Sequence, residues 1–547
     1  MSDAIRVTPL GGLGEVGMNC MLIEARETRI LIDCGVTFPK DGAGADVAHA
    51  DFSSLGHGPD ALDAILLTHG HEDHVGALPY LLERCPAPVF GPPYALAVAR
   101  ERLAERGLLE SADLRPITPG ERVRLGAFEL EPVRVAHSIP DATALVLRTD
   151  AGVIVHSGDF KIDDRPTDGE AFDHARFRAL GEQGVLLLMS DSTNIDREGH
   201  TQGEAAVARH LAETIARVEG RAIVALFGSN VHRLQALVGA AEATGRKLCL
   251  LGRSLQMHGR LASELGLLEG LAAVQIPERE ARKLPRDQLL VGATGTQGEG
   301  PAALPRLARG DHRSLELEAG DTVIVSARVI PGCELSVYDV LDRLERRGVQ
   351  VITRQEDPRL HCSGHAAREE QAELIRLLRP RFFVPVHGSF HHLSRHARLA
   401  ESLGVRDTLV VENGQGFELS ERGFERLPAI SVGRVYRRWG EELDAEMRRA
   451  RGLMLELGSA MLAVAVDLDL RPLGLARVEQ RGFLREGPEA ETLLADAGQS
   501  VTRELARADS SDLDDLKDRA RRALRRFFRK AVGRTPLITV AVLEVEP

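Results

Sequence analysis

Hydrophobic positions along the first 160 residues come in short runs that polar turns separate. The runs are rich in β-branched and aliphatic residues, as is typical of strands, and they cover residues 20–25, 30–35, 63–69, 128–138, 144–149 and 152–160. Between them, residues 75–83 and 95–110 carry apolar positions at helical spacing. The alternation predicts an α/β fold with extensive strand pairing in this part of the chain.

A second alternating stretch extends from about residue 203 to residue 361. Strand-like runs at 222–230, 247–252 and 321–329 alternate with amphipathic helices such as 335–348, which predicts a separate α/β domain. After the strand-like run 381–389, the last fifth of the chain adds a charged segment, an apolar run, a basic helix and a terminal strand. This order predicts a small α+β domain at the C-terminal end.

Length, composition and charge narrow the classes of protein. A chain of 547 residues corresponds to about three or four domains at roughly 150 residues each, and 43% hydrophobic residues are ample for packed cores. Only 4% of the residues are aromatic, which disfavours the large stacking platform of a sequence-tolerant single-strand binder. The net charge is −12, so a nucleic acid would need a local basic groove.

The cysteines and the apolar runs indicate the compartment. The six cysteines are scattered without a CxxC pair, so we expect neither a disulfide framework nor a cysteine-ligated zinc module, but a reducing, cytoplasmic compartment. From the N-terminal residues MSDAIRVTPLGG we expect no export signal. The most apolar run, 460–466, is far shorter than the roughly 18 residues of a membrane span, so we expect no membrane association.

The segment His69–Gly–His–Glu–Asp–His74 is the most informative motif. His69 and His71 project to one side of an extended chain, and Asp73 and His74 fall where the chain turns into the helix 75–83. The spacing excludes the HExxH helix, because His74 follows Glu72 by only two positions. Four ligand-type side chains in one loop predict a metal site that can serve two ions.

Three further candidate ligands stand at the ends of β-rich runs, namely His137, Asp159 and His387. A lone His in such a place is often structural, but the first motif favours a ligand role for all three. Five imidazoles and two carboxylates suit zinc, with manganese as the oxygen-tolerant alternative.

These motifs, taken with others in the same order, resemble the metallo-β-lactamase superfamily, and within it the beta-CASP nucleases of the ribonuclease J family. The resemblance covers essentially the whole chain and rests on GGLGEVGMN (11–19), LIDCG (31–35), LLTHGHEDHVGALPYLL (66–82), His137, SGDFK (157–161), SDSTN (190–194), GSNVHR (228–233), GRS (252–254), TGTQGEG (294–300), IPGCE (330–334), HCSGHA (361–366) and PVHGS (385–389).

The resemblance implies an αββα sandwich with an inserted beta-CASP α/β domain and a small C-terminal α+β domain. The boundaries that we expect are 1–202 for the first part of the metallo-β-lactamase domain, 203–360 for the insert, 361–432 for the second part, and 433–547 for a linker and the C-terminal domain. Independently, Asp191 and His387 must approach one site although 387 − 191 = 196 positions separate them, so a whole domain must be inserted between them.

The resemblance also assigns the site residues. One metal would take His69, His71 and His137 and the other Asp73, His74 and His387, with Asp159 bridging the two and Asp33 supporting the site. The catalytic positions would be His365, Asp191 and Asp73. Contacts with substrate phosphates would come from Ser229, Asn230, His361, Ser363, Gly364 and His365.

Two positions depart from the family pattern. Ser389 follows Gly388 where the family usually has Glu, which puts in doubt any ligand-orienting or RNA contact of that Glu. Cys362 replaces a more usual Val in the HxSGH loop, and we expect little effect from this change.

Other motifs have alternative interpretations. Gly12, Gly14 and Gly17 satisfy GxGxxG, but the next segments are two strands rather than a helix, so a hairpin turn is favoured over a dinucleotide site. Residues 517–534 carry nine basic side chains and one acid, which fits either a packed helix with a solvated face or a direct RNA contact. We expect His391, His392 and His396 to lie at the surface or behind the ligands.

The function that we expect is a two-zinc ribonuclease that cleaves single-stranded RNA internally and from a 5′-monophosphate end, in RNA maturation and decay. The resemblance implies a homodimer or homotetramer. The alternatives are a hydrolase of the same fold that acts on DNA or on a small ester or thioester, and a non-catalytic RNA-processing scaffold.

Overall fold

The computed structural model describes residues 4–39, 44–420, 422–507 and 512–545. Two compact units are present, one formed by Met1–Thr37 with His49–Arg434 and the other by Phe38–Ala48 with Val435–Pro547. No helix of the described residues is long and apolar enough to cross a membrane. The first three residues of the segment in which we expect no export signal lie outside the described residues.

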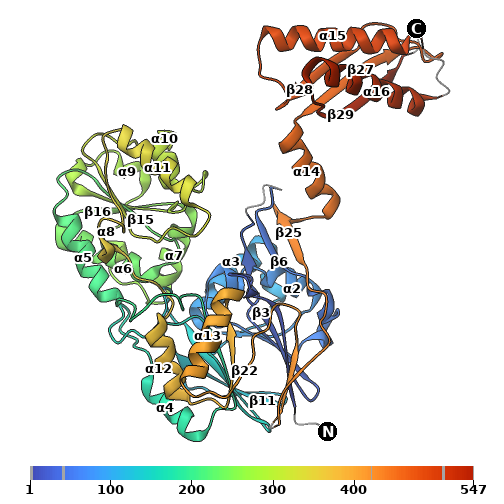
Figure 1. Cartoon of the computed structure of the whole chain (residues 1–547). Coiled ribbons are helices and arrows are strands. Elements are labelled where there is room, and N and C mark those ends of the chain that lie inside the picture. Colours follow the sequence, from blue (N-terminus) through green and yellow to red (C-terminus); the bar gives the residue numbers. More distant parts are fainter. Residues whose placement is uncertain (1–3, 40–43, 421, 508–511, 546–547) are drawn as a thin grey trace. The chain divides into compact units, whose positions relative to one another are not determined.

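Two sheets packed face to face form the centre of the first unit (Figure 1). The first sheet has the order β24 (Gly423–Arg426), β23 (Phe417–Ser420), β1 (Ile5–Gly11), β3 (Cys20–Ala25), β4 (Thr28–Ile32), β7 (Ala64–Leu66), β8 (Val89–Gly91), β9 (Leu114–Pro116). The second has the order β10 (Val123–Leu125), β11 (Phe128–Arg134), β12 (Thr143–Thr149), β13 (Gly152–His156), β14 (Leu187–Asp191), β20 (Phe382–Val386), β22 (Asp407–Thr408).

Helices cover the outer faces of both sheets, so the predicted αββα sandwich is confirmed. Aliphatic side chains of both sheets, such as Ile23 and Leu147, share one core. Phe177 and Leu374 form a second core on the outer face of the second sheet. The covering helices are α1 (Glu72–Val75), α2 (Leu78–Arg84) and α3 (Pro93–Glu105) for the first sheet and α4 (His174–Gln183), α12 (Arg368–Leu378) and α13 (Phe390–Ser402) for the second.

The predicted hairpin at the N-terminal glycines is also confirmed. β1 pairs antiparallel with β3, and Gly12, Gly14 and Gly17 in the connection all have positive φ. These backbone conformations favour glycine, so the glycines serve the turn and not a dinucleotide site.

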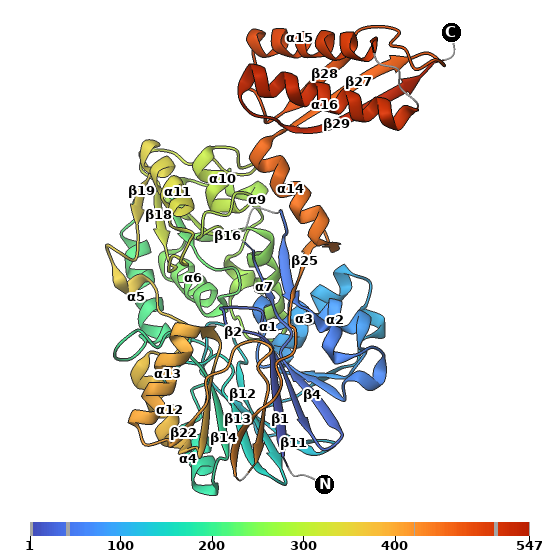
Figure 2. The ribbon, with the colours of Figure 1, turned by 45° about the vertical axis from the view of Figure 1, so that its right-hand side comes forward.

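An insert separates two neighbouring strands of the second sheet. β14 and β20 pair in parallel with Asp191 opposite Val386, and the chain between them forms a five-stranded parallel sheet. Its order is β16 (Lys247–Leu251), β17 (Leu289–Ala293), β15 (Ala222–Ala225), β18 (Thr322–Val325), β19 (Gln350–Ile352). The flanking helices include α5 (Glu204–Ala216), α6 (Val231–Thr244), α7 (Arg253–Glu264), α10 (Ala303–Arg309) and α11 (Glu334–Arg346) (Figure 2).

The second unit contains a small α+β domain, as predicted. β27 (Ser459–Val466) pairs antiparallel with β28 (Arg477–Arg481) and parallel with β29 (Leu537–Glu544). The helices α15 (Pro488–Leu505) and α16 (Leu513–Val532) share one hydrophobic core with this sheet. α14 (Ala445–Leu457) precedes β27.

Candidate metal centre

The strands of both sheets carry the predicted ligands just beyond their carboxyl ends. His69 and His71 follow β7, and Asp73 and His74 belong to the short helix α1. His137 follows β11, Asp159 follows β13 and His387 follows β20. The structure brings these residues into two groups whose ligand atoms lie within 4.8 Å of one another, with Asp159 in both groups.

In the first group three imidazoles converge. His71 Nδ1 lies 3.0 Å from His69 Nε2 and 3.1 Å from His137 Nε2, while Asp159 Oδ2 lies 3.7 Å and 3.8 Å from those Nε2 atoms. Ligand nitrogens about 2.0–2.1 Å from a tetrahedral zinc ion stand about 3.3 Å apart, so the observed spacing fits this ion. The Nδ1–H of His137 donates to the Gly364 carbonyl at 2.6 Å, which leaves Nε2 available to a metal ion.

Burial keeps all three of these imidazoles neutral. It lowers the pKa of His71 to about 4 and those of His69 and His137 well below the usual value, in spite of the nearby Asp159 carboxylate. A neutral imidazole is the form that binds a metal ion, so the electrostatics agree with the spacing.

The second group combines Asp73, His74 and His387 with Asp159. His74 Nε2 lies 3.2 Å from Asp159 Oδ2, and His387 Nε2 lies 3.5 Å from Asp73 Oδ2. The Nδ1–H of His387 donates to Asp159 Oδ1 at 2.7 Å, whereas its buried Nε2 has no hydrogen-bond partner in the described part of the chain. A buried nitrogen left without a partner among carboxylates suits a metal ligand.

Asp33 supports the second group, as a carboxylate behind a ligating His does. His74 Nδ1–H donates to Asp33 Oδ2 at 2.8 Å, which leaves His74 Nε2 free to face Asp159. The backbone N–H and the hydroxyl of Thr68 also donate to this carboxylate, both at 2.8 Å. Asp33 and His387 both have left-handed backbones, with φ of 58° and 52°, and such strain is typical of functional positions.

A third group places Asp191 and His365 beside the ligands. His365 Nδ1–H donates to Asp191 Oδ2 at 2.8 Å, and Thr193 donates to Asp191 Oδ1 from its backbone and its hydroxyl. Burial lowers the pKa of His365, but the Asp191 carboxylate outweighs this effect and holds the pKa above its usual value. His365 is half-buried, so this imidazole can reach a substrate.

The predicted phosphate contacts divide into two sets. Gly364 packs against His137, and Ser363 Oγ accepts a hydrogen bond from the His365 backbone, so this loop adjoins the ligands directly. Asn230 instead caps α6, where its side chain accepts from the Arg233 backbone, and Ser229 precedes it in the insert. The buried Nδ1 of His361 has no hydrogen-bond partner among the described residues.

Ser389 and Cys362, the two residues that depart from the family pattern, both contact other side chains. Ser389 Oγ lies 3.2 Å from His392 Nδ1, while Cys362 Sγ donates to the buried Glu204 carboxylate at 3.1 Å. The Cys362 side chain therefore belongs to a buried polar network. His391 is exposed beside Asp196, whereas His396 is fully buried 3.0 Å from Ser192 Oγ.

Sequence reasoning missed two supporting side chains. Thr68 bonds Asp33, and the Asn19 amide lies 3.0 Å from His74 Nε2 and 3.2 Å from the Asp73 carbonyl. Both lie within motifs of the sequence, Thr68 next to His69 and Asn19 next to Met18, but neither threonine nor asparagine indicates a metal site by itself.

The basic helix α16 has two kinds of cation. Lys517, Arg519 and Arg521 pair with acids three or four positions earlier on the same helix. Within the described residues, no ion pair involves the exposed side chains of Arg522, Arg525, Arg529 and Lys530. The C-terminal half of α16 therefore presents unpaired positive charge.

Four family descriptions match successive parts of the chain. They are "Metallo-beta-lactamase superfamily" over residues 13–188, "Ribonuclease J, beta-CASP domain" over 219–344, "Zn-dependent metallo-hydrolase RNA specificity domain" over 359–410 and "Ribonuclease J C-terminal domain" over 449–545.

Relatives match over nearly the whole length. The chain is 37% identical to "Ribonuclease J" of Sinorhizobium meliloti, with 98% of this chain and 97% of the relative covered. It is 36% identical to "Ribonuclease J" of Thermus thermophilus, with 99% and 96% covered, and 36% identical to that of Mycobacterium tuberculosis, with 100% and 98% covered. A crystal structure of a protein of unknown function from Enterococcus faecalis shares the fold, with a TM-score of 0.55 and 17% identity over 76% of this chain and 100% of the other.

Fold and site together define a zinc-dependent metallo-hydrolase of the metallo-β-lactamase superfamily with a beta-CASP insert. Within this class, the relatives that match over nearly the whole length show the family. The chain belongs to the ribonuclease J family.

Proposed function

We propose that this chain hydrolyses phosphodiesters of single-stranded RNA with two zinc ions, or manganese in their place, both internally and stepwise from a 5′-monophosphate end, in RNA maturation and decay. The observation that carries the proposal is the position of Asp159, whose Oδ2 lies within 3.2–3.8 Å of imidazole nitrogens in both ligand groups. A shared carboxylate suits two neighbouring ions better than one.

These contacts support the proposed ligand sets. His69, His71 and His137 would hold one ion and Asp73, His74 and His387 the other, with Asp159 between them. When bound, the ions supply Lewis acidity, which makes water a nucleophile at neutral pH and offsets the negative charge of a phosphodiester.

His365 carries the proton chemistry in this proposal. Its Nδ1–H is held by Asp191, so its Nε2 is the atom that donates a proton to the departing oxygen or stabilises the charge on phosphorus. Asp191 acts as a positioning residue, because its carboxylate contacts the imidazole rather than the substrate.

Ser229, Asn230, His361 and Ser363 would receive the 5′-monophosphate. The unpartnered Nδ1 of His361 supports this role, since a buried imidazole nitrogen without a partner among the described residues is available to a ligand. Gly364 lets this loop pass close to the candidate ligands, because an added Cβ would meet the His137 ring at 2.8 Å.

We also propose domain boundaries and an assembly. The metallo-β-lactamase domain covers residues 1–202 and 361–432, the insert covers 203–360, and the linker and C-terminal domain cover 433–547. The proposed assembly is a homodimer or homotetramer. A cytoplasmic location is supported by the six cysteines, all of which are described and are free thiols.

Three labelled substrates test the proposed function. The metal-loaded chain should cleave RNA, and should act far more slowly on the matching single-stranded DNA and on a thioester. Preferred cleavage of DNA or the thioester would favour the other hydrolases of this fold. Absence of bound zinc in the purified protein, together with no cleavage of RNA, would favour a non-catalytic scaffold.

A further inference from the structure

A cavity of about 480 Å³ lies in the insert, apart from the metal ligands. Its walls come from the segment after β18, from α11 and from the segment after β19. The volume is in the range of roughly 300–1,000 Å³ that is usual for small-molecule sites. The lining residues are Val325, Ala327, Arg328, Val329, Glu334, Val337, Tyr338, Leu341, Thr353, Arg354, Gln355 and Pro358.

Two arginines give the lining of the cavity positive charge. Within the described residues, the side chains of Arg328 and Arg354 have neither an ion pair nor a hydrogen bond, and Arg354 Nε is buried without a partner. Burial, Arg197 and Arg328 all lower the pKa of Arg354, so the three guanidinium groups lie close enough to repel one another. Unpaired guanidinium groups held together are destabilising unless an anion neutralises them.

Most of the other lining residues are apolar. Val329, Val337 and Leu341 are among them, and Tyr338 is 53% exposed although it is aromatic. Glu334 is the one acid among the lining residues, and its carboxylate already accepts a hydrogen bond from the Gly332 backbone at 2.7 Å. A ligand that fits both the arginines and the apolar lining has a phosphate and a flat, weakly polar ring, which is the chemistry of a nucleotide.

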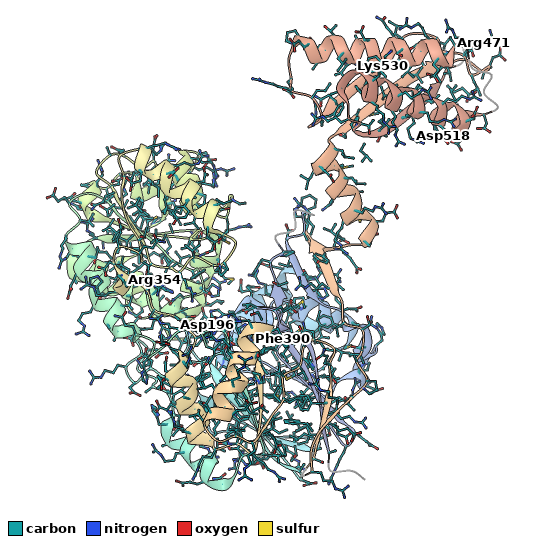
Figure 3. The ribbon with its side chains drawn as sticks, in the orientation of Figure 1. Asp196, Arg354, Phe390, Arg471, Asp518 and Lys530 are labelled. Atoms are coloured by element: carbon teal, nitrogen blue, oxygen red, sulfur yellow. The ribbon has the colours of Figure 1, made fainter. Side chains whose placement is uncertain are left out.

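The cavity lies at the same edge of the insert's sheet as one of the proposed phosphate contacts. Arg328 and Arg354 follow the carboxyl ends of β18 and β19, as Ser229 follows that of β15, so all three lie at one edge of a parallel sheet. The segment after β19 continues through the short helix Pro358–Leu360 into the loop of His361 and His365. Figure 3 labels Arg354 within the insert.

We propose that this cavity is a second nucleotide site, in which Arg328 and Arg354 bind a phosphate of the RNA strand and Tyr338 stacks on the adjoining base. The inference rests on the proposed function, because it takes the ligand from the substrate strand. It assigns to the insert a contact beyond the 5′-phosphate pocket. Base stacking on an aromatic ring is the usual way in which proteins hold unpaired nucleotides.

Binding of an uncleavable RNA to the metal-loaded full chain tests this site. The probe is a short 5′-phosphorylated RNA whose bridging phosphodiester oxygens are replaced by methylene groups, so that the linkages keep their charge but cannot be hydrolysed, and its binding is followed by fluorescence anisotropy. Arg328→Gln and Tyr338→Ala should each raise its Kd about tenfold, as expected when one charge-assisted hydrogen bond or one stacked base is removed. Both side chains are exposed, so the fold should survive. The matched control is Arg346→Gln on α11, which removes an exposed guanidinium paired with Asp342.

Unchanged RNA affinity in both variants would overturn the inference. A titration with adenosine 5′-monophosphate shows whether the site binds a free nucleotide instead of the RNA strand. If the variants bind adenosine 5′-monophosphate more weakly than the unmodified chain does but bind RNA equally well, the ligand is not part of the RNA strand and the inference is overturned. If the unmodified chain neither binds nor cleaves RNA, the proposed function itself fails. If it does both and the variants match it, only the second site fails.

Discussion

His365 donates a 2.8 Å hydrogen bond from Nδ1 to Asp191, a residue 174 positions earlier in the chain. Asp191 ends β14 and is fully buried, so the carboxylate is fixed before substrate arrives. Thr193 holds its other oxygen through two hydrogen bonds. The imidazole therefore has one orientation, with Nε2 available for proton transfer.

Asp191→Asn should lower kcat by about 10²–10⁴, the usual contribution of a positioned acid or base, with little change in KM. The amide keeps the shape of the side chain but removes the charge that favours protonated His365. Cleavage kinetics over a range of pH should show the alkaline limb, where His365 loses its proton, shifted to lower pH, because loss of the Asp191 charge lowers the His365 pKa. Metal content and Tm should stay near those of the unmodified chain. A raised KM at constant kcat would contradict the positioning role.

Asp73→Ala should remove one ion and reduce cleavage by orders of magnitude, since the second ion supplies several kcal/mol of transition-state stabilisation. Elemental analysis should find about half the zinc, with the fold intact by circular dichroism. Glu72→Gln is the control, because Glu72 belongs to the same motif but pairs with Arg102 instead of the ligands. Full activity after removal of one ion would exclude the two-ion assignment.

The sequence was sufficient to predict the sandwich, the insert and all the residues in the ligand groups, because ligand chemistry is concentrated in few residue types. His69 and His74 are recognisable from one short motif. The cavity beside Arg354 was not predictable in the same way. Its lining comes from three segments that are separate in the sequence. Whether an Arg is paired, or whether Tyr338 is exposed, can be known only from the fold.

A buried ionic network links the two parts of the first unit. Glu204 of the insert accepts hydrogen bonds from Arg233 at 3.1 Å and from Cys362, and its carboxylate lies 3.4 Å from Lys161 Nζ. These four side chains are almost completely inaccessible. Although burial raises the pKa of Glu204, Lys161 and Arg233 outweigh it and hold the pKa well below its usual value.

This network should make stability fall in acid. A carboxyl group whose pKa is lower in the folded state stabilises the fold at pH above the unfolded pKa of about 4.3 and loses that effect as the pH falls toward the folded value. Glu204→Gln should destabilise the chain by about 3–5 kcal/mol at neutral pH, because Lys161 and Arg233 lose their partner. Thermal unfolding of both proteins from pH 7 to pH 3 should show a smaller acid-dependent decrease of stability in the variant. Parallel decreases would mean that Glu204 does not titrate with folding.

The unpaired face of α16 should bind RNA phosphates. Replacing Arg522, Arg525, Arg529 and Lys530 by Gln should weaken RNA binding and make its salt dependence shallower by about 0.7 for each phosphate that is no longer bound. Figure 3 labels Lys530 on this helix. The control variant carries Arg519→Gln and Arg521→Gln, which remove cations already paired on the same helix. Equal salt dependence in the two variants would show that α16 only carries a solvated face.

The 5′ end of the RNA should decide the mode of cleavage. RNA with a 5′-monophosphate should be degraded stepwise, whereas a 5′-triphosphate should resist stepwise degradation but still permit internal cleavage, because two further phosphates lack donors in a pocket built for one. His361→Ala should narrow the difference between the two ends by about 1–2 kcal/mol, the contribution of one charge-assisted hydrogen bond. Ser363→Ala should do the same, but its hydroxyl also accepts the His365 backbone N–H, so internal cleavage of the triphosphate RNA must be measured in parallel. Equal stepwise degradation of both RNAs by the unmodified chain would show that no such pocket operates.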